Sequence, residues 1–332
     1  MSELRQDPIT KRWVIIASER AHRPRQQTAI EAISNAQVCP FCTGHEDMTP
    51  PEVLAFRDAK AEANSPGWSV RVVPNKYPAL APDSAAQFDN DGFYQARNGI
   101  GVHEVIIETP AHVTSMADLD QRQFERILVA YQERLRYWQS DGRWQYALIY
   151  KNQGERAGAT LEHAHSQLII LPQLPRQLVD ELDGVEEHFA AASKCIYCDV
   201  IASETARQTR LVSNHDDFIA LCPFAPRFPY EIWILPKAHA PAFEQCSEQD
   251  VAVLGRVLRD VITRLARGLD DPPFNFVLHS NPWNESANSH YHWHIEIMPQ
   301  LARAAGFEWG SGMHINPIAP EAAARLLRNA LL

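Results

Sequence analysis

Residues 152–172 read NQGERAGATLEHAHSQLIILP and combine a glycine-punctuated loop, two closely spaced histidines and an apolar run. In an extended strand alternate side chains point the same way, so His163, His165 and Gln167 would share one face. Glycines let backbone amides approach a bound anion such as a phosphate group. The segment therefore predicts a phosphate site, although an isolated His-x-His pair is more often only the polar face of a half-buried strand.

The composition limits the class of protein. The chain has 332 residues, of which 45% are apolar and 9% aromatic, as expected for a packed globular protein of one large or two ordinary domains. Its net charge of -10 argues against general nucleic-acid binding. It contains no run of about 18 apolar residues, so no membrane span is expected. The N-terminal sequence MSELRQDPITKRW lacks the apolar core of a secretory signal, and we expect a cytoplasmic location.

The sequence contains an internal repeat. CPFC (39–42) corresponds to CIYC (195–198), and VIIETPAH, ending at His112, corresponds to IWILPKAH, ending at His239. LEHAHSQLIILPQL, which contains His163, corresponds to SHYHWHIEIMPQL, which contains His290. His112 and His163 are 51 residues apart, as are His239 and His290. The repeat predicts two related halves, which we place at residues 1–178 and 179–332.

Each half has the same predicted order of elements. Apolar runs predict strands at 69–73, 104–108, 146–150 and 165–171, and at 217–221, 231–235, 274–279 and 292–298. Amphipathic helices are expected at 119–139, opened by Asp118 or Asp120, and at 247–269. An N-terminal strand at 13–17 and a closing helix at 320–332 complete the set. Because strands and helices do not alternate as in a parallel protein, we expect an α+β fold with antiparallel sheets.

Each half also offers a set of metal ligands: a C-x-x-C pair, a histidine after a strand, and the first histidine of a strand-borne pair. Two thiolates and two imidazoles satisfy tetrahedral zinc and leave no open coordination position. The predicted sets are Cys39, Cys42, His112 and His163, and Cys195, Cys198, His239 and His290. His292 and His294 lie close to His290 and compete with it. A thioredoxin-like redox pair is the alternative interpretation of each C-x-x-C.

If His163 faces a metal, His165 is left free beside the glycine loop. A neutral imidazole is a competent nucleophile near pH 7, and its attack on phosphorus would give a labile phosphoramidate. Gln167 could donate to a phosphoryl oxygen, and Gly158 and Thr160 offer an amide and a hydroxyl. Cations would have to come from elsewhere, and the candidates are Arg20, Arg23, Arg25, Lys76 and Lys151.

The second half has the fuller histidine set, His290, His292 and His294, but the segment before it, NPWNESANS, contains no glycine. For that reason the first half is predicted to be catalytic. The second half would then be structural or would form a wall for an acceptor.

Seven segments resemble one known family. They are RAHRP (20–24), CPFC (39–42), VPNKYPAL (73–80), TPAH (109–112), NQGERAGATLEHAHSQ (152–167), FPYEIWILPKAH (228–239) and HWH (292–294). Together they resemble the galactose-1-phosphate uridylyltransferases of the histidine triad superfamily, over nearly the whole chain.

The resemblance implies duplicated histidine-triad-like halves that form a half-barrel, and a homodimer with shared active sites. It implies that His165 is the nucleophile that carries a nucleoside monophosphate and that Gln167 is its phosphate partner. The residues that it implies for the nucleotide are Arg20, Arg23, Asn75, Asn152, Gly158 and Thr160.

Three features depart from that family. His-Ala-His replaces its usual His-Pro-His, and FEWGSGMHIN (307–316) stands where a hexose-phosphate-binding Gly-Tyr-Glu is expected. The second C-x-x-C is not general among uridylyltransferases. The last two features look more like the relatives that act on ADP-glucose as phosphate adenylyltransferases.

The leading functional hypothesis is a ping-pong nucleotidyltransferase. It would move a nucleoside monophosphate from UDP-glucose or ADP-glucose to a hexose 1-phosphate, or in the adenylyl version to phosphate. A hydrolase of nucleotide conjugates and a zinc-stabilised, non-catalytic nucleotide-binding module are the alternatives.

Overall fold

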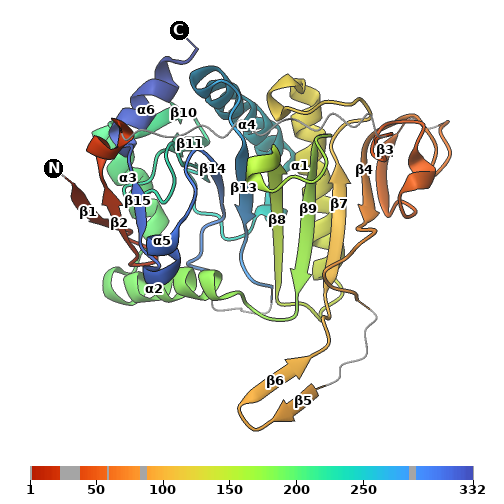
Figure 1. Ribbon diagram of the computed structural model, residues 1–332, viewed down its shortest axis with the longest axis horizontal. Helices are drawn as coiled ribbons and strands as arrows, with labels where there is room; N and C mark the ends of the chain where they lie inside the picture. Colours follow the sequence, from red (N-terminus) through yellow and green to blue (C-terminus); the bar gives the residue numbers. More distant parts are fainter. Residues whose placement is uncertain (1, 23–37, 58–59, 83–87, 284–288, 332) are drawn as a thin grey trace.

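The computed structural model describes residues 2–22, 38–57, 60–82, 88–283 and 289–331. Its centre is one ten-stranded sheet in the order β10-β11-β12-β14-β13-β8-β9-β7-β4-β3, and all neighbouring pairs are antiparallel (Figure 1). The first-half strands are β3 (Leu54–Arg57), β4 (Trp68–Pro74), β7 (Val102–Ile107), β8 (Tyr146–Gln153) and β9 (His165–Leu171). The second-half strands are β10 (Leu211–Asn214), β11 (Phe218–Leu221), β12 (Ile232–Pro236), β13 (Phe274–His279) and β14 (His294–Pro299).

The two halves join edge to edge through β8 and β13. In that pairing Asn152 lies opposite Asn275 and Lys151 opposite Phe276. Read outward from this seam, β8, β9, β7, β4 and β3 of one half correspond to β13, β14, β12, β11 and β10 of the other. The expected α+β fold with antiparallel, duplicated halves is therefore confirmed. The division after residue 178 falls within α2 (Arg176–Ala192) and stays a prediction.

Two long helices, α1 (Gln121–Gln139) and α4 (Glu248–Leu269), pack on one face of the sheet and against each other. Asp120 caps α1 by accepting a hydrogen bond from the Gln123 amide, and Ser247 and Asp250 form a capping box at the start of α4. Alternate residues of β9, such as Leu168 and Ile170, enter the same buried core as both helices. The intervening residues, beginning with His165, are left for the opposite face.

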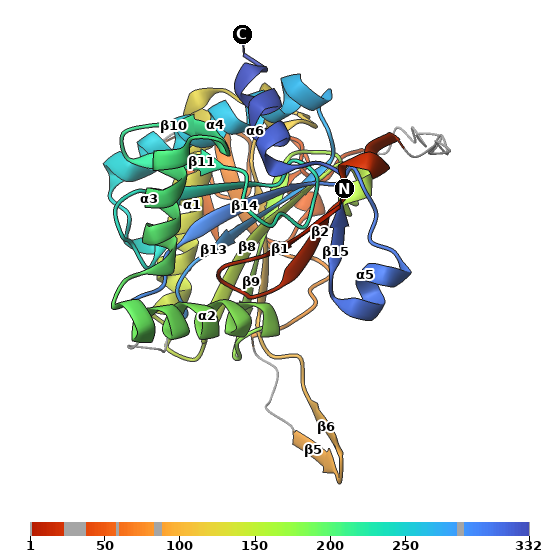
Figure 2. The same ribbon diagram turned by 90° about the vertical axis from the view of Figure 1, so that its left-hand side faces the viewer.

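The N-terminal arm crosses to the second half. β1 (Glu3–Gln6) and β2 (Trp13–Ile16) form a hairpin, and β15 (His314–Asn316) adds to β2 in parallel. Figure 2 shows this small sheet beside α5 (Gly306–Ser311), with α2 (Arg176–Ala192) and α3 (Ile196–Arg207) nearby. The closing helix α6 (Pro320–Asn329) packs on β10 and α4.

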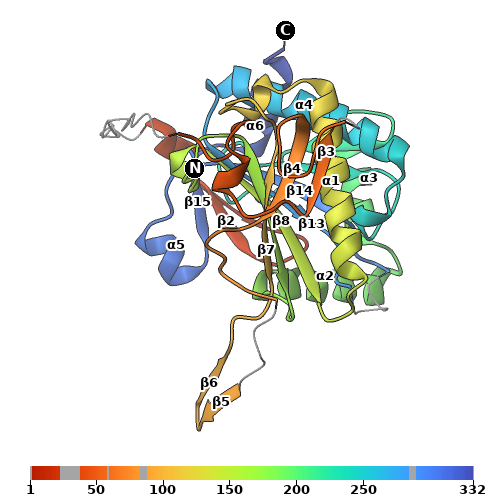
Figure 3. The same cartoon turned by 90° about the vertical axis from the view of Figure 1, so that its right-hand side faces the viewer.

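A two-stranded hairpin, β5 (Phe88–Asp91) and β6 (Tyr94–Arg97), projects away from the main body (Figure 3). Among the described helices, none has the length and apolar character needed to cross a membrane.

Candidate active site

The first group of possible metal ligands lies beside the start of β9. Cys39, Cys42, His112 and His163 place one ligand atom each within 4.8 Å of one another. Sγ of Cys42 is 3.4 Å from Nδ1 of His112 and 3.6 Å from Nδ1 of His163. Zinc bonds of about 2.3 Å to sulfur and 2.0–2.1 Å to nitrogen require tetrahedral S···N edges of roughly 3.6 Å. The predicted first set is therefore brought together with spacings that fit a metal ion.

The hydrogen bonding and protonation of His163 and Cys42 bear on whether this group can bind a cation. Nε2–H of His163 donates to the Thr109 carbonyl oxygen over 2.7 Å, which leaves Nδ1 to face the two sulfurs. Burial lowers the pKa of His163 to about 4, so the imidazole is neutral near pH 7. Burial and the adjacent Cys39 raise the pKa of Cys42 to about 11, so a nearby cation would be needed to make this sulfur a thiolate.

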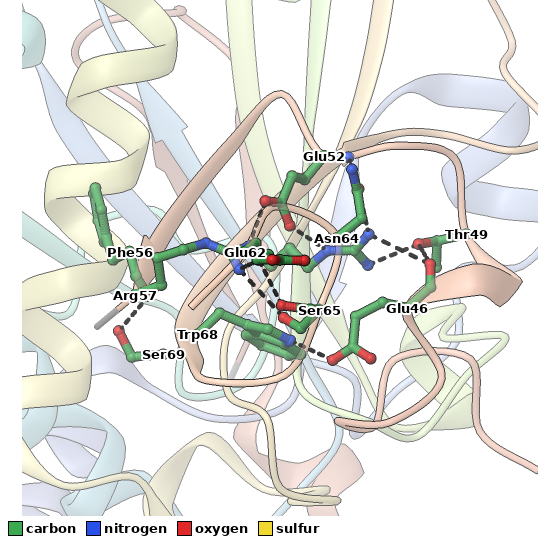
Figure 4. A network of polar contacts seen from close by, with 11 residues as sticks. Glu46, Thr49, Glu52, Phe56, Arg57, Glu62, Asn64, Ser65, Trp68 and Ser69 are labelled. Atoms are coloured by element: carbon green, nitrogen blue, oxygen red, sulfur yellow. Dashed lines mark hydrogen bonds and ion pairs between the residues drawn. The ribbon is translucent and has the colours of Figure 1, made fainter. Parts of the chain in front are cut away.

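The loop that carries Cys39 and Cys42 is tied to the sheet by a polar network (Figure 4). Nε1–H of Trp68 donates to Oε1 of Glu46 over 2.7 Å, and the Gly44 amide donates to the other oxygen of Glu46. The buried guanidinium of Arg71 donates to Thr49 and forms an ion pair with Glu52 at 2.9 Å. Because these bonds join the loop to β4, the cysteines are held in place by the protein itself.

The second group contains His292 and not His290, which corrects the sequence prediction. Cys195, Cys198, His239 and His292 place their ligand atoms within 4.8 Å of one another. Nδ1 of His292 is 3.8 Å from Sγ of Cys195 and 3.7 Å from Sγ of Cys198, and its Nε2–H donates to the Pro236 carbonyl. The ring of His290 instead stacks on Phe189 with 3.3 Å between ring centroids.

The error came from the equal 51-residue spacing. His239 and His292 are 53 residues apart, so the second half has two more residues between these ligands than the first. Position relative to the strand was the better guide, because His163 and His292 both stand two residues before the first residue of their strands, β9 and β14.

The candidate nucleophile, His165, is the first residue of β9 and is 8% exposed. Its Nδ1–H donates to the His163 carbonyl oxygen over 2.7 Å, so the lone pair is on Nε2. Burial and then the charge of Lys151 lower the pKa of His165 below its ordinary value, which keeps the imidazole neutral. His163 therefore contributes both to the metal group and, through its carbonyl, to the orientation of His165.

Gln167 lies on the same face of β9, half-buried, two residues further along. Its Oε1 accepts hydrogen bonds from Nε2 of His103 at 2.8 Å and from the hydroxyl of Tyr150 at 3.1 Å. Asn75 lies on the other side of His103, and its Nδ2 is 3.1 Å from Nε2 of that histidine. Asn75 and Gln167 are thus brought together, whereas His103 and Tyr150 were missed because neither stands in a segment that suggests chemistry.

The glycine loop after β8 is shaped by the second half. Gly154 and Gly158 have positive φ values of 81° and 92°, which favour glycine. Nδ2 of Asn275 donates to Oδ1 of Asn152 and to the Ala157 carbonyl, each over 2.8 Å. Because Oδ1 of Asn152 accepts from Asn275, the Nδ2 hydrogens of Asn152 are the ones left to bind a ligand. Gly158 and Thr160 lie exposed at the end of the loop.

The candidate cations that lie in the described part of the chain, Arg20, Lys76 and Lys151, are not gathered around His165. Lys151 is buried beneath the sheet, where its Nζ donates to Glu108 over 2.7 Å and to the His165 carbonyl over 3.1 Å, so it is not a phosphate ligand. Arg20 lies in the short 3-10 helix Ser18–His22, which Figure 1 shows on the α6 side of the molecule and apart from β9. Lys76 is exposed and its Nζ donates to the Met48 carbonyl. Arg23 and Arg25 lie outside the described residues.

A third group, Glu181, His279 and His294, is buried in the second half and could also hold a cation by its geometry. Nε2 of His279 lies 3.4 Å from Glu296, and Arg227 forms an ion pair with the same carboxylate. Burial opposes the ionisation of Glu296, but Arg227 and His279 hold the pKa of this carboxyl well below its usual range. Sequence patterns did not predict this group, because Glu181 comes from α2, which we did not expect.

The fold and the site define a member of the galactose-1-phosphate uridyl transferase family. The family model for the N-terminal domain matches residues 1–175 and that for the C-terminal domain matches residues 181–328. The chain therefore belongs to this family and is an enzyme of the nucleotidyltransferase class.

Individual relatives fall in two activity groups. The ADP-glucose phosphorylase of Arabidopsis thaliana is 35% identical over 99% of this chain and 93% of its own length. The galactose-1-phosphate uridylyltransferase of Thermotoga maritima is 30% identical over 99% of this chain and 98% of its own. The crystal structure of the Arabidopsis enzyme with bound ADP-glucose has a TM-score of 0.84 at 33% identity and covers 99% of both chains. A uridylyltransferase structure has a TM-score of 0.78 at 27% identity and covers 100% of this chain and 98% of its own.

Proposed function

We propose that this enzyme transfers a nucleoside monophosphate from a nucleoside diphosphate hexose to a phosphate-bearing acceptor, through a covalent nucleotidyl intermediate on His165. The observation that carries the proposal is the orientation of His165. Its Nδ1–H is held by the His163 carbonyl, its Nε2 is unprotonated, and the amide group of Gln167, which can donate to a phosphoryl oxygen, lies on the same face of the strand.

In the first step Nε2 of His165 attacks the α-phosphorus, and the bond from that phosphorus to the bridging oxygen breaks. Hexose 1-phosphate leaves with the electron pair. The ring becomes positively charged as the P–N bond forms, and the hydrogen bond from Nδ1 to the His163 carbonyl stabilises this charge. Amide hydrogens of Gln167 donate to a non-bridging phosphoryl oxygen.

In the second step an oxygen of the acceptor attacks the same phosphorus and the P–N bond breaks, which returns the electron pair to Nε2. The backbone around Gly158 and the hydroxyl of Thr160 are placed at the open end of the loop, where the nucleotide phosphates would lie. Asn75 and Asn152 are assigned to the nucleotide.

Zinc is the metal that the two Cys2His2 sets fit best, since soft thiolates and imidazoles favour it and four ligands suit its tetrahedral geometry. Bound zinc would be structural, because each set leaves no position for substrate. At the first site Cys39, Cys42, His112 and His163 would hold it, and the second site would use Cys195, Cys198, His239 and His292. The first ion would fix His163 and, through its carbonyl, the ring of His165.

A homodimer would supply the missing cations. Arg20 is assigned to the nucleotide, yet it lies apart from β9 within one chain, as Figure 1 shows. A second copy that places its Arg20 over His165 would resolve this separation. The cytoplasmic location stays a prediction.

Two donor and acceptor pairs remain. The first is UDP-glucose with a hexose 1-phosphate such as galactose 1-phosphate, as the names of the Thermotoga maritima and Haemophilus influenzae relatives suggest. The second is ADP-glucose with inorganic phosphate. It is favoured by the 35% identity to the ADP-glucose phosphorylase and by Phe307, which stands where the uridylyltransferase pattern has tyrosine.

The test is brief incubation with UDP-glucose or ADP-glucose labelled at the α-phosphate, followed by denaturation. We expect protein-bound label that is stable to base and lost in acid. Galactose 1-phosphate should discharge a uridylyl adduct, and inorganic phosphate an adenylyl adduct. The His165→Asn variant should carry no label, whereas His215→Asn, a control in an exposed turn, should be labelled normally. Full labelling of His165→Asn would contradict the proposal.

A further inference from the structure

The carboxamide of Gln167 is oriented by two neighbours from different strands. His103 comes from β7 and Tyr150 from β8, the strands that flank β9. Both side chains direct a polar atom at the same oxygen, Oε1 of Gln167, at 2.8 and 3.1 Å. The three side chains are half-buried on the face of the sheet that carries His165.

The donor roles follow from the backbone. The Ala79 amide can only donate, and it lies 3.2 Å from Nδ1 of His103, so Nδ1 is the accepting nitrogen. Since Nδ1 carries no proton, the ring proton is on Nε2, which donates to Oε1 of Gln167. Oδ1 of Asn75 accepts from the Tyr77 amide, so Nδ2 of Asn75 faces the same Nε2 at 3.1 Å as a contact between two donors and not as a hydrogen bond. With two donors on Oε1, the amide group of Gln167 has a fixed direction, and its two hydrogens remain for a ligand.

The second half lacks this arrangement. Tyr150 lies opposite Gln167, and Val277 lies opposite Glu296 in the corresponding pair. His103 stands two residues before Val105, which pairs with Gln167, and Glu231 stands two residues before Trp233, which pairs with Glu296. The two orienting donors thus occur only in the half that carries the candidate nucleophile.

We propose that His103 and Tyr150 are positioning residues that hold the Gln167 carboxamide with its N–H groups toward the transferred phosphoryl group. This inference rests on the proposed function, in which Gln167 stabilises charge on that group. His103 and Tyr150 act through Gln167 and do not themselves contact the phosphorus.

The test is a mutant cycle read out as the rate of adduct formation on His165 in a single turnover. Replacing Gln167 with alanine should slow this step on the order of 100-fold, since one donor to a developing charge is lost. The His103→Phe variant should slow it about tenfold with little change in nucleotide-sugar affinity, and His103→Gln, which keeps a donor, should recover most of the rate. In the Gln167→Ala background, His103→Phe should have no further effect beyond about twofold.

The Tyr150→Phe variant removes a single hydroxyl and provides a second test if His103→Phe does not fold. Its matched control is Tyr146→Phe, which alters a buried tyrosine four residues earlier on the same strand. Tyr150→Phe should slow adduct formation and Tyr146→Phe should not. Equal slowing by His103→Phe with and without Gln167, or no slowing by either single variant, would overturn the inference.

A second measurement separates this inference from the proposed function. If the unmodified enzyme forms no adduct with either sugar, the proposed function is wrong. Crystal structures of the unmodified enzyme and of the His103→Phe/Tyr150→Phe double variant then decide the positioning role. We expect the Gln167 carboxamide to rotate or become disordered in the double variant, and an unchanged orientation would overturn the inference.

Discussion

The two halves of the sheet carry corresponding histidines, His165 and His294, which make the same kind of backbone hydrogen bond but have different neighbours. His165 opens β9 and donates from Nδ1 to the His163 carbonyl over 2.7 Å, and His294 opens β14 and donates to the His292 carbonyl over 3.1 Å. Two residues on, the first strand has Gln167 and the second has Glu296. A carboxylate at this position repels a phosphoryl group, whereas a carboxamide donates to it.

Access also differs between the halves, since His165 is 8% exposed and His294 is 1% exposed. The turn between β1 and β2 contributes Asp7, Ile9 and Arg12 to the wall over His294, where a cavity of only about 10 Å³ remains. Arg227 holds Glu296 from within the same cluster. Burial and then the neighbouring His279 lower the pKa of His294 to about 3. We therefore expect only the imidazole of His165, which has the donor Gln167 beside it, to act on a phosphate group.

The largest expected effect comes from removing each histidine in turn. His165→Asn should lower nucleotidyl transfer by at least about 10³-fold, because the nucleophile is lost. His294→Asn should keep adduct formation within a few-fold and lower thermal stability, because it disturbs a buried polar cluster. Transfer rates and melting temperatures are measured for both variants. Equal loss of transfer in the two would show that the halves share the chemistry.

The Gln167→Glu variant should make the first half resemble the second. A carboxylate beside the phosphoryl group should slow adduct formation on the order of 10²–10³-fold, through the lost donor and the added repulsion. The exposed Gln249→Glu change in α4 adds the same charge elsewhere and serves as the control. Single-turnover rates of adduct formation are measured for both variants. Comparable rates for Gln167→Glu and the control would show that a carboxylate at position 167 does not slow adduct formation.

The metal content of two variants should show whether His290 or His292 is the ligand in the second metal group. We expect about two zinc ions per chain in the purified enzyme, from two four-ligand sets. His292→Ala should lose one ion and several degrees of melting temperature, whereas His290→Ala should keep both ions. Elemental analysis of each variant gives the answer, and two ions in His292→Ala would contradict the assignment.

The smallest expected effect concerns the pH dependence. The His165 pKa is lowered by burial and by Lys151, and only the neutral ring is nucleophilic, so kcat/KM should persist below pH 6.5 and fall when the ring protonates. Removing the Lys151 charge raises this pKa, so the acid limb should move to higher pH. The double variant Lys151→Met/Glu108→Gln avoids an unpaired buried carboxylate, since these two groups pair at 2.7 Å. Glu108 raises the pKa of His165 by less than Lys151 lowers it, so the acid limb of the double variant should still move to higher pH, and Glu108→Gln alone should move it to lower pH.

The control for this shift is Lys60→Met, an exposed lysine, which should leave the pH profile unchanged. The acid limb of the double variant should lie at higher pH than that of Glu108→Gln alone, and coincident limbs in these two variants would show that Lys151 does not influence His165.

Local patterns predicted most of the fold. The strand 165–171 and the strand 274–279 appear with the expected bounds, and Ser247 and Asp120 cap the two long helices. The helix Arg176–Ala192 was missed, although Leu178, Leu182, Val185 and Phe189 repeat at helical spacing, because a glycine and many acidic residues interrupt the pattern. The pairing of β2 with β15 joins the two ends of the chain, and no local signal specifies such a contact.

The site was predictable where chemistry sits in one segment and not where it depends on which face a side chain takes. Lys151 looked like a free cation beside the loop, yet its place in β8 turns it toward Glu108 and α1. His103 and Tyr150 lie on neighbouring strands, and only the register of those strands brings them to Gln167. The Glu181, His279 and His294 group required three separate elements to meet.

The most direct test of the central claim is to map the covalent adduct. The enzyme is incubated with UDP-glucose or ADP-glucose, digested at alkaline pH where a phosphoramidate survives, and analysed by mass spectrometry for a peptide carrying a nucleoside monophosphate. We expect modification of His165 in the peptide that contains LEHAHSQ and none of His294. An adduct on His294, or transfer activity with no modified histidine, would contradict this expectation.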